Sequence, residues 1–171
     1  MKNYNTILIF ALLLVVAASS RFVSHLWNFT FLGGVFIFAG AYFQDKKVSF
    51  ALMLSTMLLT DLLIGFHSQM PAVYLGYAAV VAIGFLLTSQ SSRLKVLAAA
   101  LSGSFVFYAV SNFGVWMEGA LYPKTVQGLI DCYLMALPFY KNQVAGDLIS
   151  TFVIFETARQ VSSYQTQKAR T

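Results

Sequence analysis

The sequence predicts an all-α membrane protein, a compact bundle of about six transmembrane helices. Of the 171 residues, 58% are hydrophobic and only 10% are charged, whereas about a quarter of a soluble domain is charged. The mean hydropathy of +0.72 favours the same class. The length predicts one helical domain over residues 1–160 and a polar tail over 161–171. The net charge of +5 comes without a basic stripe interleaved with aromatic residues, so we expect no nucleic acid as a partner.

Six apolar runs separated by short polar stretches define the predicted spans: 6–23, 29–43, 48–66, 71–88, 94–117 and 144–156. A span needs about 20 residues, with about 17 as the lower bound. The second run is short and contains Gly33 and Gly34, and the sixth is interrupted by Asp147 and Glu156. The first run has an alternative interpretation, because a basic start, an apolar middle and small residues at the end are also typical of a cleaved signal peptide.

The positions of lysine and arginine predict the orientation in the membrane. With six spans both termini share one side, which then holds the eight residues Lys2, Lys46, Lys47, Arg93, Lys95, Arg159, Lys168 and Arg170. The other side holds the remaining three, Arg21, Lys124 and Lys141. This excess predicts that both termini lie in the cytoplasm.

The stretch between the fifth and sixth spans, residues 119–142, is too polar to cross a membrane. From Val126 to Leu137 its apolar residues recur at i, i+3, i+4, i+7, i+8 and i+11, which is one face of a helix. We predict a short amphipathic helix in this outer loop, lying on the membrane surface or folded down as a cap over the bundle.

Polar residues from separate spans fall at one depth below the outer surface. Asp61 lies about five residues, or roughly 8 Å, below the outer end of its span. A charge in the middle of a bilayer costs about 2.5–3.5 kcal/mol, so such residues face the bundle interior, water or a partner. The candidate ligand-binding residues are Arg21, Asn28, Asp61, His67, Asn112, Trp116 and Asp147.

Two interpretations of this set stay open. In the first it lines an outward-facing binding pocket, with aromatic surfaces from Trp27, Tyr74, Trp116, Tyr122 and Tyr133, and residues 119–142 form a lid. The candidate lid residues are Tyr122, Lys124, Asp131 and Tyr133. In the second the polar residues form an internal network, for instance an ion pair of Arg21 with Asp61 or Asp147, that only fixes helix register. Tryptophan and tyrosine also belong at membrane interfaces without binding anything.

Other chemistry has weaker support. His25 and His67 with Cys132 or Asp61 would be a metal site, but no two of them lie at i and i+4 on one helix. The chain has no GxSxG, HExxH, Walker or GxGxxG motif, so we expect no enzyme, no catalytic residues and no cofactor. Glu156 and Arg159, three residues apart, predict an interfacial ion pair. Close helix packing is predicted at the small residues Gly33, Gly34, Gly40, Ala99 and Gly103.

Three stretches carry a family resemblance: "NFTFLGGVFIFAGAYF", "DLLIGFHSQMPAVY" and "SNFGVWMEGALYPKTVQGLIDCYLMALPFYKNQVAGDL". Over roughly residues 21–156 they resemble a family of small bacterial membrane proteins of unknown function. That family is distantly similar to the S-components of energy-coupling factor transporters, the subunits that capture vitamins and related micronutrients. S-components often dock their transmembrane partner through an AxxxA arrangement on the first helix, whereas Ala11, Ala17 and Ala18 do not fit that spacing.

The resemblance implies a protein of the bacterial inner membrane, in contact with the lipid bilayer, that captures a small vitamin-like nutrient or metabolite from the outer side. A separate ATPase and transmembrane coupling module would supply the energy, since the chain has no nucleotide motif. The alternative is a structural or assembly subunit of a larger envelope complex, in which the buried polar residues serve packing only. A membrane enzyme acting on lipid-linked substrates would need a catalytic set that the sequence does not show.

Overall fold

A computed structural model describes residues 2–23, 28–88 and 90–168, and this part of the chain folds into helices without a strand. The six helices are α1 (Lys2–Val23), α2 (Leu32–Tyr42), α3 (Lys46–Ile64), α4 (Met70–Gly84), α5 (Arg93–Glu118) and α6 (Val126–Lys168). Each predicted apolar run overlaps one of these helices, so the all-α class is confirmed.

Short local signals set several helix ends. Asp45 caps α3 by accepting a hydrogen bond from the Lys47 amide at 2.9 Å. Pro71 lies in the first turn of α4, where its missing amide hydrogen costs nothing. Gly119 ends α5 in the left-handed region at φ 73°. These signals determine where α3 and α4 begin and where α5 ends, and the chain turns back at the connections beside them.

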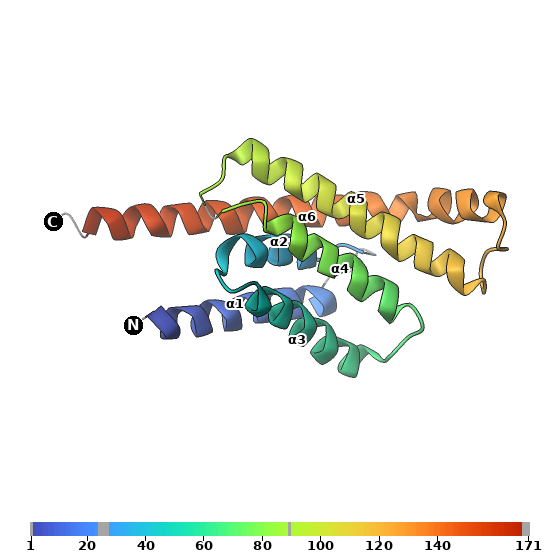
Figure 1. Ribbon diagram of the computed structural model, residues 1–171, viewed down its shortest axis with the longest axis horizontal. Coiled ribbons are helices and arrows are strands. Elements are labelled where there is room, and N and C mark those ends of the chain that lie inside the picture. Colours follow the sequence, from blue (N-terminus) through green and yellow to red (C-terminus); the bar gives the residue numbers. More distant parts are fainter. Residues whose placement is uncertain (1, 24–27, 89, 169–171) are drawn as a thin grey trace.

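The helices run back and forth, so that the two termini lie at the same end of the bundle (Figure 1). This termini end also carries the connections 43–45 and 85–92, and the opposite loop end carries the connections 65–69 and 119–125. The basic residues Lys46 and Arg93 therefore lie toward the end where the chain starts and finishes. Which side of the membrane this end faces stays a prediction.

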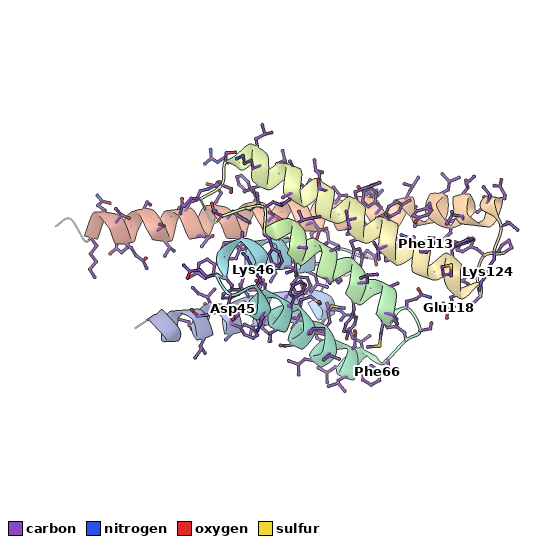
Figure 2. All side chains as sticks on the ribbon, viewed as in Figure 1. Asp45, Lys46, Phe66, Phe113, Glu118 and Lys124 are labelled. Atoms are coloured by element: carbon purple, nitrogen blue, oxygen red, sulfur yellow. The ribbon has the colours of Figure 1, made fainter. Side chains whose placement is uncertain are left out.

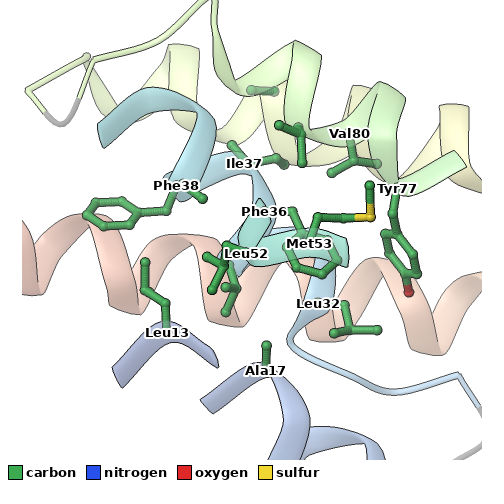
Figure 3. Close-up of a cluster of buried hydrophobic side chains, with 14 of the residues drawn as sticks. Leu13, Ala17, Leu32, Phe36, Ile37, Phe38, Leu52, Met53, Tyr77 and Val80 are labelled. Atoms are coloured by element: carbon green, nitrogen blue, oxygen red, sulfur yellow. The ribbon is translucent and has the colours of Figure 1, made fainter. Parts of the chain in front are cut away.

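The centre of the bundle is α2. All nine residues from Leu32 to Gly40 are buried, and the side chains of α1, α3 and α4 surround it in Figure 3. Small residues permit this enclosure: a Cβ on Gly34 would overlap Ser150 of α6, and one on Gly40 would overlap the backbone of α4. With 11 residues, α2 is about 16 Å long, roughly half of a hydrocarbon core of about 30 Å.

Two helices of the described chain, α3 and α5, are long and apolar enough to cross a membrane by length and composition. Apolar side chains also cover much of the outer surface: Leu62 and Leu63 of α3 are 63% and 77% exposed. Charged residues lie toward both ends, with Asp45 and Lys46 at one and Glu118 and Lys124 at the other (Figure 2). Exposed apolar surface of this extent is typical of membrane or protein–protein contact. A plan in which all six helices span the membrane stays a prediction.

The prediction of a separate short amphipathic helix in the outer loop is wrong. Residues 126–137 are the start of α6, a single helix of 43 residues that is about 65 Å long and extends past the rest of the bundle at the termini end (Figure 1). Pro138 lies inside α6 and removes one helical hydrogen bond, the one to the Leu134 carbonyl. Pro138 and Leu134 are both exposed, so the proline ring displaces no packed neighbour and the helix continues.

Candidate functional site

A cavity of about 300 Å³ lies in the half of the bundle nearer the loop end. Every helix, or the loop beside it, contributes to its wall. Its polar lining consists of Arg21, Asn28, Thr30, His67, Gln69, Ser111, Asn112 and Gln143. Its aromatic lining consists of Tyr77, Phe107, Tyr108, Phe139 and Tyr140. The volume is at the lower end of what small-molecule sites offer.

Four of the seven residues predicted to bind a ligand line this cavity, namely Arg21, Asn28, His67 and Asn112. Asn28 reaches it from the loop before α2 with a positive φ of 60°, which asparagine tolerates better than most residues. The other three, Asp61, Trp116 and Asp147, are not part of the wall. Trp116 instead donates its indole N–H to the Pro123 carbonyl at 3.1 Å, which closes the connection between α5 and α6.

Asp61 lies directly behind Arg21. Its carboxylate is fully buried, and Oδ1 lies 2.7 Å from Nη1 of Arg21, whose side chain is 15% exposed. Oδ2 accepts a hydrogen bond from the Tyr74 hydroxyl at 2.8 Å, and the guanidinium also donates to Thr60. This cluster joins α1, α3 and α4. Of the two ion pairs considered from the sequence, Arg21 forms the one with Asp61, and the cavity meets the cation rather than the carboxylate.

Asp147 lies behind another cavity residue, Gln143. Its carboxylate, only 3% exposed, accepts hydrogen bonds from the Ser104 hydroxyl at 2.6 Å and from Nε2 of Gln143 at 3.4 Å. The backbone N–H of Gly33 donates to it as well, and a Cβ at Gly33 would overlap the carboxylate. Donors from α2, α5 and α6 thus hold Asp147 in place, and glycine is the residue that lets α2 approach.

The aromatic wall differs from the prediction. Tyr77 of α4 packs on Phe107 of α5 with ring centroids 4.1 Å apart, and Tyr108 packs on Tyr140 of α6 at 4.5 Å. Four of the residues predicted for this role do not line the cavity: Tyr74, Trp116, Tyr122 and Tyr133. The fifth, Trp27, lies outside the described residues. One signal in the sequence indicates part of the correct set: Tyr140, Gln143 and Asp147 follow at i, i+3 and i+7, one face of a helix.

The four predicted lid residues do not line the cavity either. Tyr133 donates its hydroxyl to the Ala109 carbonyl at 2.7 Å and packs against Tyr108. Asp131 accepts a hydrogen bond from the Gln127 amide along the same helix. Tyr122 and Lys124 lie in the connection between α5 and α6, with Lys124 against Gly119. Because residues 126–137 belong to the long α6, they form a wall of the bundle and not a separate cover.

Other predicted contacts have mixed outcomes. The ion pair of Glu156 with Arg159 is present, and Arg93 joins it at 2.9 Å. Gly103 lies against Ile37, as close helix packing predicts. In the described ranges, no three histidine, cysteine, aspartate or glutamate side chains gather as a metal site would need. His25 of the metal interpretation lies outside these ranges.

Over residues 1–169 the chain matches the family described as a family of unknown function (DUF6580), and it belongs to that family. Neither a curated protein nor a solved structure matches it. Membership in a family of unknown function agrees with the resemblance found in the sequence. The similarity to S-components stays a prediction.

Proposed function

We propose that this member of the DUF6580 family is an integral membrane protein that binds a small polar or amphipathic nutrient or metabolite for uptake. The cavity at the loop end carries the proposal, because charged, amide, hydroxyl and aromatic groups from α1, α4, α5, α6 and the loops before α2 and α4 converge on a volume of about 300 Å³. Small-molecule sites combine largely apolar walls with a few placed polar groups in this way.

The orientation of the chain supports capture from outside. The excess of lysine and arginine toward the termini end favours a cytoplasmic position for that end. The cavity then lies in the outer half of the bundle, in the inner membrane of a bacterium. A separate ATPase and transmembrane coupling module would drive release, as the similarity to S-components implies.

A cavity-filling variant tests the function. We expect protein purified in mild detergent to retain a small molecule that mass spectrometry detects after denaturation. Ala136→Trp places an indole at the cavity wall, so it should abolish retention. Met135→Trp, at the neighbouring 64% exposed position on α6, is the matched control and should retain the molecule. Equal retention by both variants, or none by the unaltered protein, would contradict binding in this cavity.

One observation favours the structural alternative, a subunit that scaffolds an envelope complex. Asp61 and Asp147 are satisfied inside the bundle by Arg21, Tyr74, Ser104 and Gln143, and such networks stabilise a fold without any ligand. Affinity purification in mild detergent distinguishes the two functions. An ATPase pair among the recovered proteins supports uptake, and envelope-assembly proteins support the scaffold.

A further inference from the structure

We infer that the cavity selects a planar aromatic anion that also carries a hydrogen-bond donor, and that Gln143 determines this selectivity. The inference rests on the proposed binding function and adds to it the chemical class of the ligand. Three features of the wall carry it: its charge, the fixed orientation of one amide and the paired aromatic rings.

The charge that faces the cavity is positive. Arg21 lines it, and no described aspartate or glutamate does. The buried Asp61 compensates Arg21 from behind, at 2.7 Å, and so holds the guanidinium in place. A guanidinium presented in this way binds a carboxylate or another oxyanion through charge-assisted hydrogen bonds.

The Gln143 amide is fixed by its own hydrogen bonds. Its Nε2 donates to the Ser104 carbonyl at 3.1 Å and to Oδ2 of Asp147 at 3.4 Å, which uses both hydrogens of the amide. Oε1 is then the amide atom that this cavity residue offers to a bound molecule, and it can only accept. Asp147 is a positioning residue, since it fixes which amide atom faces the ligand without lining the cavity.

Aromatic rings provide the remaining surface. The pairs Tyr77 with Phe107 and Tyr108 with Tyr140 bring rings from α4, α5 and α6 to one cavity. Planar rings pack well against such surfaces. A ligand that meets all three features has a ring, an anionic group for Arg21 and an O–H or N–H group for Gln143.

Three naphthalene probes separate these features: naphthoate has the anion only, naphthol the donor only, and the ring-hydroxylated naphthoate isomers have both. Binding to the purified full chain is measured by isothermal titration calorimetry. We expect the best hydroxynaphthoate to bind about tenfold more tightly than naphthoate, the order of one hydrogen bond to a buried acceptor.

Gln143→Met keeps the side-chain length and removes the acceptor, so it should abolish this ratio while naphthoate affinity changes less than about twofold. Gln127→Met is the matched control, because Gln127 lies on the same helix and donates to the aspartate four residues further on, Asp131, but does not line the cavity, and it should keep the ratio. Asp147→Asn, a nearly isosteric change, weakens one of the two hydrogen bonds that orient the Gln143 amide, while the Ser104 carbonyl keeps the other, so it should reduce the ratio less than Gln143→Met does. The double variant Arg21→Gln with Asp61→Asn should lower the affinity for naphthoate and for hydroxynaphthoate about tenfold and leave the affinity for naphthol unchanged.

An unchanged ratio in both Gln143→Met and Asp147→Asn overturns the role of Gln143. Failure of all carboxylate probes to bind the unaltered protein, or tighter binding of naphthol, overturns the ligand class. The proposed binding function still holds in those cases if the purified protein retains a molecule that Ala136→Trp releases. It fails only if that retention experiment fails.

Discussion

At the scale of single residues, the carboxylate of Asp61 within the apolar run "LLTDLLIGF" has a defined partner. The contact of 2.7 Å with Arg21 places two opposite charges between α1 and α3, where little water reaches them. A buried ion pair of this kind adds little net stability compared with apolar residues of the same shape, but breaking it leaves one charge without compensation.

This asymmetry gives a prediction for the pair. Asp61→Leu alone should lower the free energy of unfolding by about 3–5 kcal/mol, because Arg21, whose side chain is only 15% exposed, is left without its partner. The double variant Arg21→Leu with Asp61→Leu should recover most of that loss. Unfolding by dodecyl sulfate in mixed micelles, followed by circular dichroism, measures both. Losses that simply add would show that the pair is not coupled.

A surface ion pair serves as the control. Glu156→Gln removes the partner of Arg93, whose side chain is 73% exposed, and of Arg159, whose side chain is 20% exposed. Water screens that pair, so we expect a much smaller loss than for Asp61→Leu. The comparison separates the effect of burial from the effect of losing a charge.

Sequence reasoning at this scale identifies residues better than their roles. Depth and polarity predicted Arg21, Asn28, His67 and Asn112, which line the cavity. The same criteria selected Asp61 and Asp147, which do not line the cavity but contact the lining residues Arg21 and Gln143. The selection was wrong because depth along a span does not show in which direction a side chain points. Gln143 was missed for the same reason.

At the scale of elements, α6 departs most from the prediction. Two proline residues bracket the loop in sequence, yet Pro138 is inside a continuous helix. The periodicity of 126–137 predicts a helix, and these residues are helical. The sequence gives no sign that this helix continues without a break into the next span. Tertiary packing of Gly128, Cys132, Gln143 and Asp147, all buried on the same helix, keeps the two parts in line.

The far end of α6 gives a second prediction. Residues 161–168 are all exposed, so a chain ending at Gln160 should melt within about 2 °C of the full chain. A chain ending at Phe152 should melt far lower, because it loses Phe155, which is fully buried with its ring 5.1 Å from that of Phe38. Thermal unfolding in detergent measures both. A large loss from the first truncation would show that the projecting turns support the bundle.

At the scale of the whole molecule, the two termini lie at the same end of the bundle. The shared position of the termini was predictable, because an even number of passes and the grouping of lysine and arginine lead to the same arrangement. The burial of α2 from Leu32 to Gly40 was not predictable, because a short apolar run with two glycines looks the same whether lipid or protein surrounds it.

The orientation in the membrane gives a third prediction. In a Cys132→Ala background, Ser68→Cys at the loop end should react with a membrane-impermeant maleimide on intact bacterial cells. Gln90→Cys at the termini end should react only after the cells are permeabilised. Both original side chains are exposed, so access to the reagent depends on the side of the membrane. The reverse labelling pattern would place the termini outside.

The enclosure of α2 also has a consequence for biogenesis. Synthesis proceeds from the N-terminus at about 5–20 residues per second, so α2 is made before α4 and long before α6. Gly33 and Gly34 then meet lipid or water until Asp147 and Ser150 arrive on the last helix. The helix at the centre of the protein is therefore among the first to be made and the last to be covered, and a nascent chain that stops before α6 exposes the glycine face of α2.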